Sequence, residues 1–263
     1  MEDGTIDFLE VYLKISNKLL SLALGLTLLI TGLYAGYALW DNNQIHQAAE
    51  NVQAEMLSLK PSFGFGEKGA SFDELLAINP DVAAWVSLDN TSIDHPILQG
   101  ETNLTYINKD VYGEFALAGS IFMDTRSDKK FRDPYSLLYG HDMIEGRMFG
   151  DLSLYKDKEF FEENSSGVLI LPDRSYTLKI YATLLAQASD DIIFDPDKHE
   201  NGLSDLIEYT EKNALYLRSE MTENLKETAN EGLQILSLTT CSGEFTDART
   251  IILAVMQPSR LVE

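Results

Sequence analysis

The sequence predicts a mainly β fold in which about eight short strands form a closed or nearly closed antiparallel barrel. Runs rich in Ile, Val, Leu, Thr and aromatic residues recur between Val82 and Met256, with turn residues between them. Such spacing is typical of small barrels. One long helical pattern interrupts the strands late in the chain, and an uncharged segment of 22 residues stands near the N-terminus. We therefore expect one barrel domain preceded by one transmembrane helix.

The composition limits the kind of partner. The chain has 263 residues, enough for one good-sized domain with additional segments. It carries 20 Lys and Arg against 42 Asp and Glu, a formal net charge of −22. This charge argues against a nucleic-acid partner, which needs clustered Lys and Arg. The acidic surface either keeps the protein soluble or attracts a basic, amine-bearing partner.

The uncharged segment, residues 19–40, is predicted to be a retained membrane anchor. As a helix it is about 33 Å long, enough to cross a hydrocarbon core of about 30 Å. Tyr34, Tyr37 and Trp40 near its end suit a membrane interface. Two alternatives remain: a signal peptide cleaved near Ala38, although its apolar core is usually shorter, and a buried helix of a soluble domain.

The basic residues around the anchor predict its orientation. Lys14 and Lys18 precede it, and no Lys or Arg follows until Lys60. Because cytoplasmic flanks carry the excess of Lys and Arg, residues 1–18 are expected to be a cytoplasmic tail. Everything after Trp40 is then expected outside the cell membrane.

Behind the anchor, residues 41–70 are predicted to be an extracytoplasmic helical stalk and linker, and residues 71–263 the folded domain. Helix formers dominate up to Lys60, and then three Gly and one Pro end the helix. Strands are predicted at Val82–Leu88, Ser92–Leu98, Gly119–Asp124, Tyr135–Tyr139, Gly167–Leu171 and Tyr176–Gln187, and on both sides of Cys241. Helices are predicted at Phe149–Tyr155, Lys158–Glu163 and Glu200–Lys226.

The only cysteine of the chain, Cys241, ends the first of the last two predicted strands. A short polar segment with one Gly separates it from the next strand, which begins at Arg249, so the pattern is strand, loop, strand. A hairpin brings these two strand ends together and places a guanidinium near the thiol. Positive charge favours the thiolate, the nucleophilic form of cysteine. The alternative is a small buried cysteine and an ordinary surface arginine.

Among the four histidines, His141 is the best candidate to act with Cys241. It follows a predicted strand end and Gly140, which permits sharp backbone geometry, and active-site side chains often project from such ends. The other three lie in the predicted stalk (His46), in a strand (His95) and in a charged loop (His199). Four scattered histidines and one cysteine show no zinc-ligand spacing, so no metal site is expected.

Several motifs of the chain resemble those of class B sortases, cell-wall transpeptidases of Gram-positive bacteria. Ser-Leu-Thr-Thr-Cys241 resembles the Thr-Leu-x-Thr-Cys signature, and Cys-x-x-Glu-Phe-x-x-Ala-Arg249 is similar to the stretch that follows it. Leu-Tyr-Gly-His141-Asp-Met is similar to Tyr-Gly-His-Asn-Met. Further likeness runs through Asn79–Trp85, Asp94–Gly100, Ala118–Phe122 and Met148–Leu152, and the resemblance covers about residues 70–258.

The resemblance implies an eight-stranded sortase β-barrel with class B helices, and it makes residues 71–263 the catalytic domain. Cys241 is expected to attack a C-terminal sorting motif of a secreted protein, similar to Asn-Pro-x-Thr or Leu-Pro-x-Thr-Gly, and an amine of the cell wall is expected to resolve the thioacyl-enzyme. His141 is the expected general acid and base, and Arg249 is expected to stabilise the oxyanion or hold the peptide backbone. The expected substrate-binding residues are Thr240, Ser242 and Glu244. No metal or organic cofactor is needed.

The chain departs from the family pattern at three positions: Ser237 replaces Thr, Asp142 replaces Asn, and Gly243 stands where many members have Tyr. None is a catalytic position, so the expected activity stands. Three alternatives remain open. The alternatives to a cell-wall transpeptidase are a pilin-polymerising sortase that uses a lysine amine, a hydrolase with the sortase fold, and an inactive barrel that serves as a surface adaptor.

Overall fold

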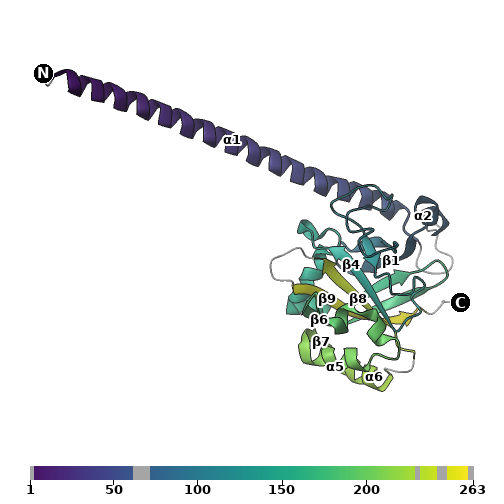
Figure 1. Cartoon of the computed structure of the whole chain (residues 1–263). Helices are drawn as coiled ribbons and strands as arrows, with labels where there is room; N and C mark the ends of the chain where they lie inside the picture. The colour runs from purple at the N-terminus through teal and green to yellow at the C-terminus, as the bar shows by residue number, and fades with distance from the viewer. Residues whose placement is uncertain (1–2, 62–71, 229–231, 242–247, 260–263) are drawn as a thin grey trace. The chain divides into compact units, whose positions relative to one another are not determined.

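Nine strands and a set of helices make up the structure, a computed structural model that describes residues 3–61, 72–228, 232–241 and 248–259 (Figure 1). The strands are β1 (Val82–Leu88), β2 (Asp94–Leu98), β3 (Ile121–Met123), β4 (Tyr135–His141), β5 (Ser166–Ile170), β6 (Ser175–Gln187), β7 (Ala214–Leu217), β8 (Ile235–Cys241) and β9 (Ala248–Pro258). The α-helices are α1 (Asp3–Ser58), α2 (Phe72–Ile78), α3 (Lys158–Glu163), α4 (Asp191–Phe194), α5 (Ser204–Asn213) and α6 (Ser219–Thr228). The 3₁₀ helices are η1 (Ile144–Gly146), η2 (Gly150–Lys156) and η3 (Pro196–His199).

Eight of these strands close a barrel. The hydrogen-bonded order is β5-β1-β2-β3-β4-β8-β9-β6, and β6 pairs with β5 to complete the ring. The eight-stranded barrel predicted from the sequence is therefore confirmed. Strand β7 is a ninth strand, which pairs with β6 beyond the end of β5. Closure leaves the barrel strands with few exposed edges.

Two pairings in the ring are parallel, in contrast to the antiparallel barrel expected from the sequence. Strand β2 pairs in parallel with β3, and β4 pairs in parallel with β8. Parallel neighbours need a crossover between them. The segment between β2 and β3 supplies the first crossover, and the chain from β4 through β5, β6 and β7 supplies the second. Hairpin signals in a sequence report only the antiparallel neighbours.

Alternation along the strands separates the barrel interior from its outer surface. The interior includes Leu138, Leu238 and Ile252, all fully buried. The intervening residues, such as Leu137 and Ile235, are buried in a second cluster outside the barrel wall. Residues of the segment between β6 and β7, here called the β6–β7 insertion (residues 188–213), complete that second cluster: Ile193, Leu203, Leu206 and Ile207.

The helix expected over Glu200–Lys226 is two helices separated by a strand. α5 ends at Asn213, β7 occupies Ala214–Leu217, and α6 begins at Ser219; the two helices lie together beside β7 (Figure 1). Residues 214–217 pair with Ala182–Leu184 of β6, along the edge that β5 leaves open. An exposed edge presents unpaired backbone groups, which β7 satisfies. Tertiary pairing thus overrides the local helical pattern.

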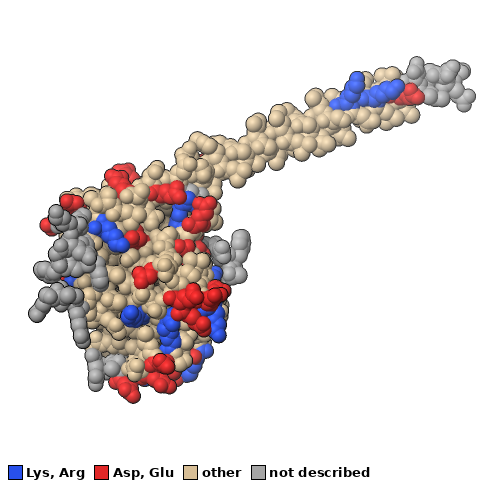
Figure 2. Space-filling model, turned by 180° about the vertical axis from the view of Figure 1, so that it is seen from behind, with Lys and Arg blue, Asp and Glu red and all other residues tan. Residues whose placement is uncertain are grey.

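Residues 3–47 of α1 belong to a separate compact unit, Met1–Gln47, and the barrel belongs to the unit Ala48–Glu263. Among the described residues α1 is one helix long and apolar enough to cross a membrane, and its apolar window, of mean hydropathy 1.9, is unburied. Figure 2 shows the middle of this helix free of charged side chains. Thr27 and Thr31 donate to backbone carbonyls one turn back, at 2.9 and 2.8 Å, so their hydroxyls need no outside partner.

The end of α1, from Ala48 to Ser58, packs on the barrel unit. Met56 is 1% exposed and belongs to a third cluster with Trp85 and Leu98. Just after the helix, Lys60 pairs with Asp94 at 2.8 Å, and Asp94 also accepts a hydrogen bond of 2.6 Å from the Trp85 indole. The last turns of α1 are therefore a part of the folded unit.

Candidate active site

The ends of β4 and β8 bring His141 and Cys241 together in the backbone. The two strands run parallel and lie side by side (Figure 1), with seven register pairs that end at Gly140↔Thr240 and His141↔Cys241. Because the pairing is parallel, both strands finish at the same end of the barrel. The Cys241 side chain lies outside the described part of the structure, so the register of its backbone is what places this residue.

Gly140 is required by close packing rather than by a sharp turn. Its φ angle is not among the positive values found at Gly119, Gly146 and other glycines. A Cβ at position 140 would lie 2.5 Å from Ile121 Cδ1 and 2.7 Å from the Phe149 ring. The sequence expectation of special backbone geometry here is wrong. The glycine instead lets the barrel interior approach the backbone directly beneath the His141 strand end.

The imidazole of His141 is half-buried and hydrogen bonded. Its Nε2 lies 2.7 Å from the backbone oxygen of Ile107, in the segment between β2 and β3. A carbonyl only accepts hydrogen bonds, so Nε2 carries the proton and Nδ1 is left for proton exchange when the ring is neutral. The Phe149 amide donates to the His141 carbonyl at 3.0 Å. This bond closes the loop that follows the histidine, here called the His141 loop (residues 142–148).

Arg249 is the second residue of β9, and its side chain reaches back to β8. Its Nη1 donates to the Thr240 carbonyl at 3.2 Å. β8 and β9 pair in antiparallel fashion up to Thr239↔Ile251, and two further residues along that register bring Arg249 opposite Cys241. The half-buried Arg249 retains a buried Nε–H with no partner among the described groups. A buried donor of this kind needs an acceptor, which a bound substrate can supply.

Of the three substrate-binding candidates, the structure describes Thr240 alone. Its side chain is 1% exposed, and its hydroxyl accepts a hydrogen bond of 3.2 Å from the Thr250 amide. The hydroxyl therefore holds β8 and β9 together. Ser242 and Glu244 lie outside the described residues, as does Gly243.

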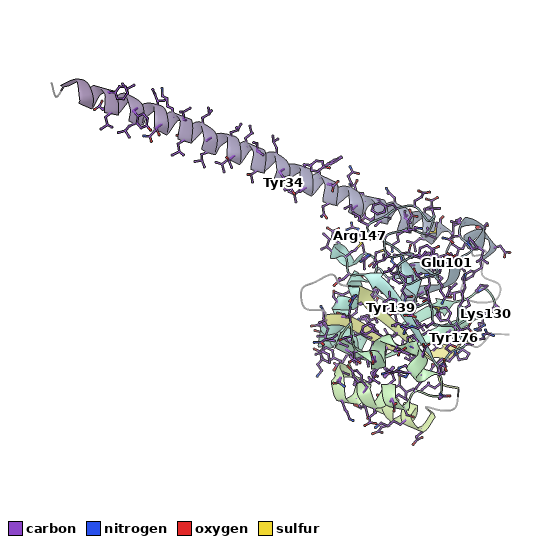
Figure 3. The ribbon with its side chains drawn as sticks, in the orientation of Figure 1. Tyr34, Glu101, Lys130, Tyr139, Arg147 and Tyr176 are labelled. Atoms are coloured by element: carbon purple, nitrogen blue, oxygen red, sulfur yellow. The ribbon has the colours of Figure 1, made fainter. Side chains whose placement is uncertain are left out.

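A buried carboxylate near the site belongs to none of the motifs found in the sequence. Asp124, just beyond β3, is fully buried. It accepts two side-chain bonds of 2.9 Å from Arg126, one of 2.9 Å from Asn103 and one of 3.0 Å from the hydroxyl of Tyr139, a residue labelled in Figure 3. Tyr139 stands two residues before His141 on β4. An acidic and a basic residue two apart after a strand are the only sequence signal of this network.

Arg126 governs the ionisation of Asp124. Burial opposes the charged form, but the hydrogen bonds and positive charge of Arg126 outweigh it and hold the pKa of Asp124 below its usual range. Burial and the nearby Asp124 charge raise the pKa of Tyr139. Asp124 is therefore a carboxylate and Tyr139 a neutral hydrogen-bond donor at neutral pH.

The remaining described histidine side chains belong to other elements, β2 and η3. His95 is buried, and burial lowers its pKa to about 4 against the opposing charge of Asp94. His199 is also buried; its Nε2 lies 2.7 Å from the Ile192 carbonyl, and its ring meets Tyr135 edge-on at 4.8 Å. Within the described residues, no group of three or more His, Cys, Asp or Glu could hold a metal ion.

Comparisons with known proteins agree on one family. No family model matches the chain. Sortase B of Staphylococcus aureus is 27% identical over 184 residues, which cover 70% of this chain and 72% of that protein. Sortase B of Listeria monocytogenes is 27% identical over 229 residues, which cover 87% of this chain and 90% of that protein.

Solved structures give the same result. A Streptococcus pyogenes class B sortase involved in pilus biogenesis is 34% identical, with a TM-score of 0.63 over 73% of this chain and 100% of that chain. A Staphylococcus aureus sortase B–substrate complex is 25% identical, with a TM-score of 0.66 over 84% of this chain and 99% of that chain. The closed eight-stranded barrel is thus a sortase fold. The chain belongs to the class B sortases, a family of cysteine transpeptidases.

Proposed function

We propose that this protein is a membrane-anchored cysteine transpeptidase that cleaves a C-terminal sorting motif of secreted proteins and transfers the acyl group to an amine of the cell wall. The observation that carries the proposal is the parallel pairing of β4 with β8, which makes His141 and Cys241 register partners. A nucleophile and its acid–base partner must lie within reach of each other. The family supports transpeptidation in general.

In the proposed reaction, the Cys241 thiolate attacks the scissile carbonyl and forms a tetrahedral oxyanion. The C–N bond then breaks, and protonated His141 gives its proton to the leaving amine. The incoming amine attacks the resulting thioester, His141 takes a proton from it, and the thiolate leaves. One amide bond is broken and another is formed, so no oxidant or reductant is required.

Arg249 is proposed to bind the oxyanion or the backbone of the sorting peptide. Its Nη1 is fixed on the Thr240 carbonyl, next to Cys241 in sequence. Its Nε–H is buried and unpaired among the described groups. This suits a donor whose hydrogen bond is made to the oxyanion that forms in the transition state. We further propose that Thr240, Ser242 and Glu244 contact the substrate.

Residues 19–40 are proposed to anchor the enzyme, with residues 1–18 in the cytoplasm, residues 41–70 as an extracytoplasmic stalk and linker, and residues 71–263 as the catalytic domain. The part of the stalk from Ala48 to Ser58 packs on the barrel unit. The uncharged stretch and the position of Lys14 and Lys18 support this topology. Protease added outside intact cells should degrade the barrel and spare an N-terminal tag. Degradation of that tag, or release of the full-length protein into the medium, would contradict the orientation or the anchoring.

A second function is supported by one relative. The Streptococcus pyogenes class B sortase at 34% identity is involved in pilus biogenesis. A lysine amine of a pilin is then the alternative acceptor, and water as acceptor would make the enzyme a hydrolase. Mass spectrometry of the products formed from a peptide with an Asn-Pro-x-Thr or Leu-Pro-x-Thr-Gly motif, in the presence of a peptidoglycan-type peptide amine or a lysine peptide, distinguishes the three reactions.

The direct test of the catalytic proposal is Cys241→Ala. We expect it to abolish attachment of sorting substrates in cells and to lower transpeptidation by several orders of magnitude. His141→Ala should have a comparable effect. Unchanged attachment with Cys241→Ala would refute the catalytic role and favour an inactive surface adaptor.

A further inference from the structure

The β6–β7 insertion covers the outer face of β4 up to the edge of the candidate active site. Tyr135 and Leu137 of β4 are buried against Ile193 and Leu203 of the insertion. Tyr139, the next outward residue, is only half-buried, and His141 follows two residues later. The insertion therefore ends about one residue pair, or roughly 7 Å, short of His141.

A sorting motif bound at His141 and Cys241 extends beyond that distance. Five extended residues span about 16 Å, so a peptide that crosses the outer face of β4 reaches the rim of the insertion. The position of this rim is then part of the peptide-binding surface. What fixes the rim to the barrel wall determines how well the peptide binds.

Arg126 makes part of that connection, beside the buried Tyr135 hydroxyl of β4, which donates a hydrogen bond of 2.8 Å to the Ile193 carbonyl. Arg126 forms two bonds of 2.9 Å with buried Asp124 of the wall. On its other side, Arg126 Nη1 bonds to Asp195 at 2.9 Å and Nη2 to the Phe194 carbonyl at 2.7 Å. The planar guanidinium thus bridges Asp124, just beyond β3, and the insertion in one fixed geometry, which a lysine ammonium cannot reproduce.

The wall side of the bridge is rigid. Asp124 also holds Tyr139 of β4 and Asn103 of the β2–β3 segment, so three wall segments share one carboxylate. Buried polar groups with every bond made specify a single geometry. A displacement of the insertion would have to break the bonds of Arg126 to Asp195 and Phe194 as well as the bond from Tyr135 to Ile193.

We infer that Arg126 is a positioning residue for peptide binding, because it holds the β6–β7 insertion, at Phe194 and Asp195, against the barrel wall at Asp124, the carboxylate that also binds Tyr139, two residues before His141. The inference rests on the proposed function and concerns the binding of the acyl donor rather than the chemical step. It predicts a rise in KM for the sorting peptide with little change in kcat.

The test uses Asp195→Asn in the full chain, with a quenched fluorogenic peptide carrying whichever of the two sorting motifs is cleaved. This change removes the ion pair to Arg126 and leaves Asp124 untouched. We expect KM to rise about threefold, in keeping with a partly exposed ion pair, and kcat to stay within twofold. Arg126→Lys, which replaces the planar guanidinium by an ammonium that cannot make all of these bonds at once, should raise KM about tenfold. The matched control is Asp191→Asn, which removes the pair of Asp191 with Lys198 inside the insertion.

Hydrogen exchange gives a readout that does not depend on activity. Exchange of residues 191–199 should rise in Asp195→Asn and stay unchanged in Asp191→Asn. A KM equal to that of the control, or a loss confined to kcat, would overturn the inference, with or without a change in exchange. Cys241→Ala separates the proposed function from the positioning role of Arg126. If Cys241→Ala keeps its activity, the proposed function fails. If Cys241→Ala is inactive and KM is unchanged in Asp195→Asn, the positioning role alone fails.

Discussion

Arg249 combines a fixed nitrogen with a free one. Nη1 is bonded to the Thr240 carbonyl, whereas Nε is buried and unpaired among the described groups. Lysine keeps the charge but has neither the Nε–H nor the planar fork. We expect Arg249→Lys to lower kcat by about 100-fold, the usual cost of one lost oxyanion donor. Steady-state kinetics with a fluorogenic sorting peptide measures the change.

The matched control for Arg249→Lys is Arg174→Lys. Arg174 is a partly exposed guanidinium that pairs with Asp173 and lies over the Tyr176 ring. Its replacement should leave kcat unchanged. If Arg249→Lys retained kcat within about threefold of the parent, the charge alone would suffice and the role assigned to Nε would be wrong.

His95 is a buried histidine whose Nε2 has no partner among the described groups. Burial lowers its pKa to about 4 in the folded protein, below the value of about 6.5 expected in the unfolded chain. The unfolded chain therefore binds the proton more readily between these two values, and stability is lost as the pH falls from about 6.5 to about 4. The loss attributable to His95 reaches about 3 kcal/mol.

Thermal unfolding of His95→Gln checks this pH dependence. The variant should lose less stability between pH 7 and pH 4.5 than the parent protein. Some slope will remain, because burial also lowers the pKa of His199. Equal pH slopes for the variant and the parent would show that His95 does not bind its proton differently in the folded and unfolded states.

At the residue scale, the sequence identified groups by chemical type but not by environment. The glycine before His141 is visible in the sequence, but its reason, the close approach of Ile121 on β3 and of Phe149 before η2, depends on packing that only the folded chain shows. Asp124 went unnoticed because its donors come from Asn103, Arg126 and Tyr139, which only the folded chain assembles. Burial of a charge cannot be read from local composition.

At the element scale, short strands were easier to predict than the long helix. The strand pattern predicts β1 at Val82–Leu88 with both bounds correct. The short helical pattern likewise predicts both bounds of α3 at Lys158–Glu163. The helical pattern over 200–226 concealed β7, because the open edge of β6 beyond β5 exists only in the assembled barrel. Local propensity decides isolated elements, and pairing decides where they end.

The end of α1 braces the loop that follows His141. Glu50 pairs with Arg147 at 2.6 Å, and Gln53 bonds to the Ser92 carbonyl at 2.9 Å. Ser92 in turn bonds to Asp151, just beyond the loop, at 2.8 Å. Arg147, labelled in Figure 3, thus lies in a chain of contacts between α1 and the His141 loop.

Loss of this brace should affect catalysis more than binding. The pair of Glu50 and Arg147 is partly exposed, so its contribution is at most about 1 kcal/mol. We expect Glu50→Gln to lower kcat two- to fivefold with KM unchanged. The double variant Glu50→Arg with Arg147→Glu, which reverses the charges of the pair, should have a higher kcat than either single charge reversal. Glu162→Gln, which removes the exposed pair with Lys158, is the control. A swap no better than either single reversal would argue against the ion pair as the brace.

At the scale of the whole molecule, the decisive strand pairing joins residues that are far apart in sequence. His141 and Cys241 meet through a parallel pair whose strands are separated by β5, β6 and β7. Periodicity predicts each strand but not its parallel partner, since no short turn marks such a pairing. The choice of His141 from position alone was therefore a hypothesis, and the register of β4 and β8 is what supports it.

The unit that contains the barrel carries a large net negative charge. Residues 48–263 hold 18 of the basic and 37 of the acidic residues, a formal charge of −19. Figure 2 shows acidic side chains spread over one face of this unit, with basic side chains among them. A field of this sign raises the encounter rate of cationic acceptors, and salt screens it. The Debye length falls from about 30 Å at 0.01 M to about 8 Å at 0.15 M salt.

This steering predicts a selective salt effect. The rate constant kcat/KM for a lysine-type amine acceptor should fall several-fold between 0.01 and 0.15 M salt, whereas that for a neutral nucleophile such as hydroxylamine should change little. Comparing the two acceptors with the same acyl donor cancels any effect of salt on acylation. Equal salt dependence would mean that the acidic surface serves solubility and that the acceptor is selected by contacts at the site. A fall confined to the cationic acceptor would mean that the acceptor is attracted by the surface as a whole before it meets the thioester.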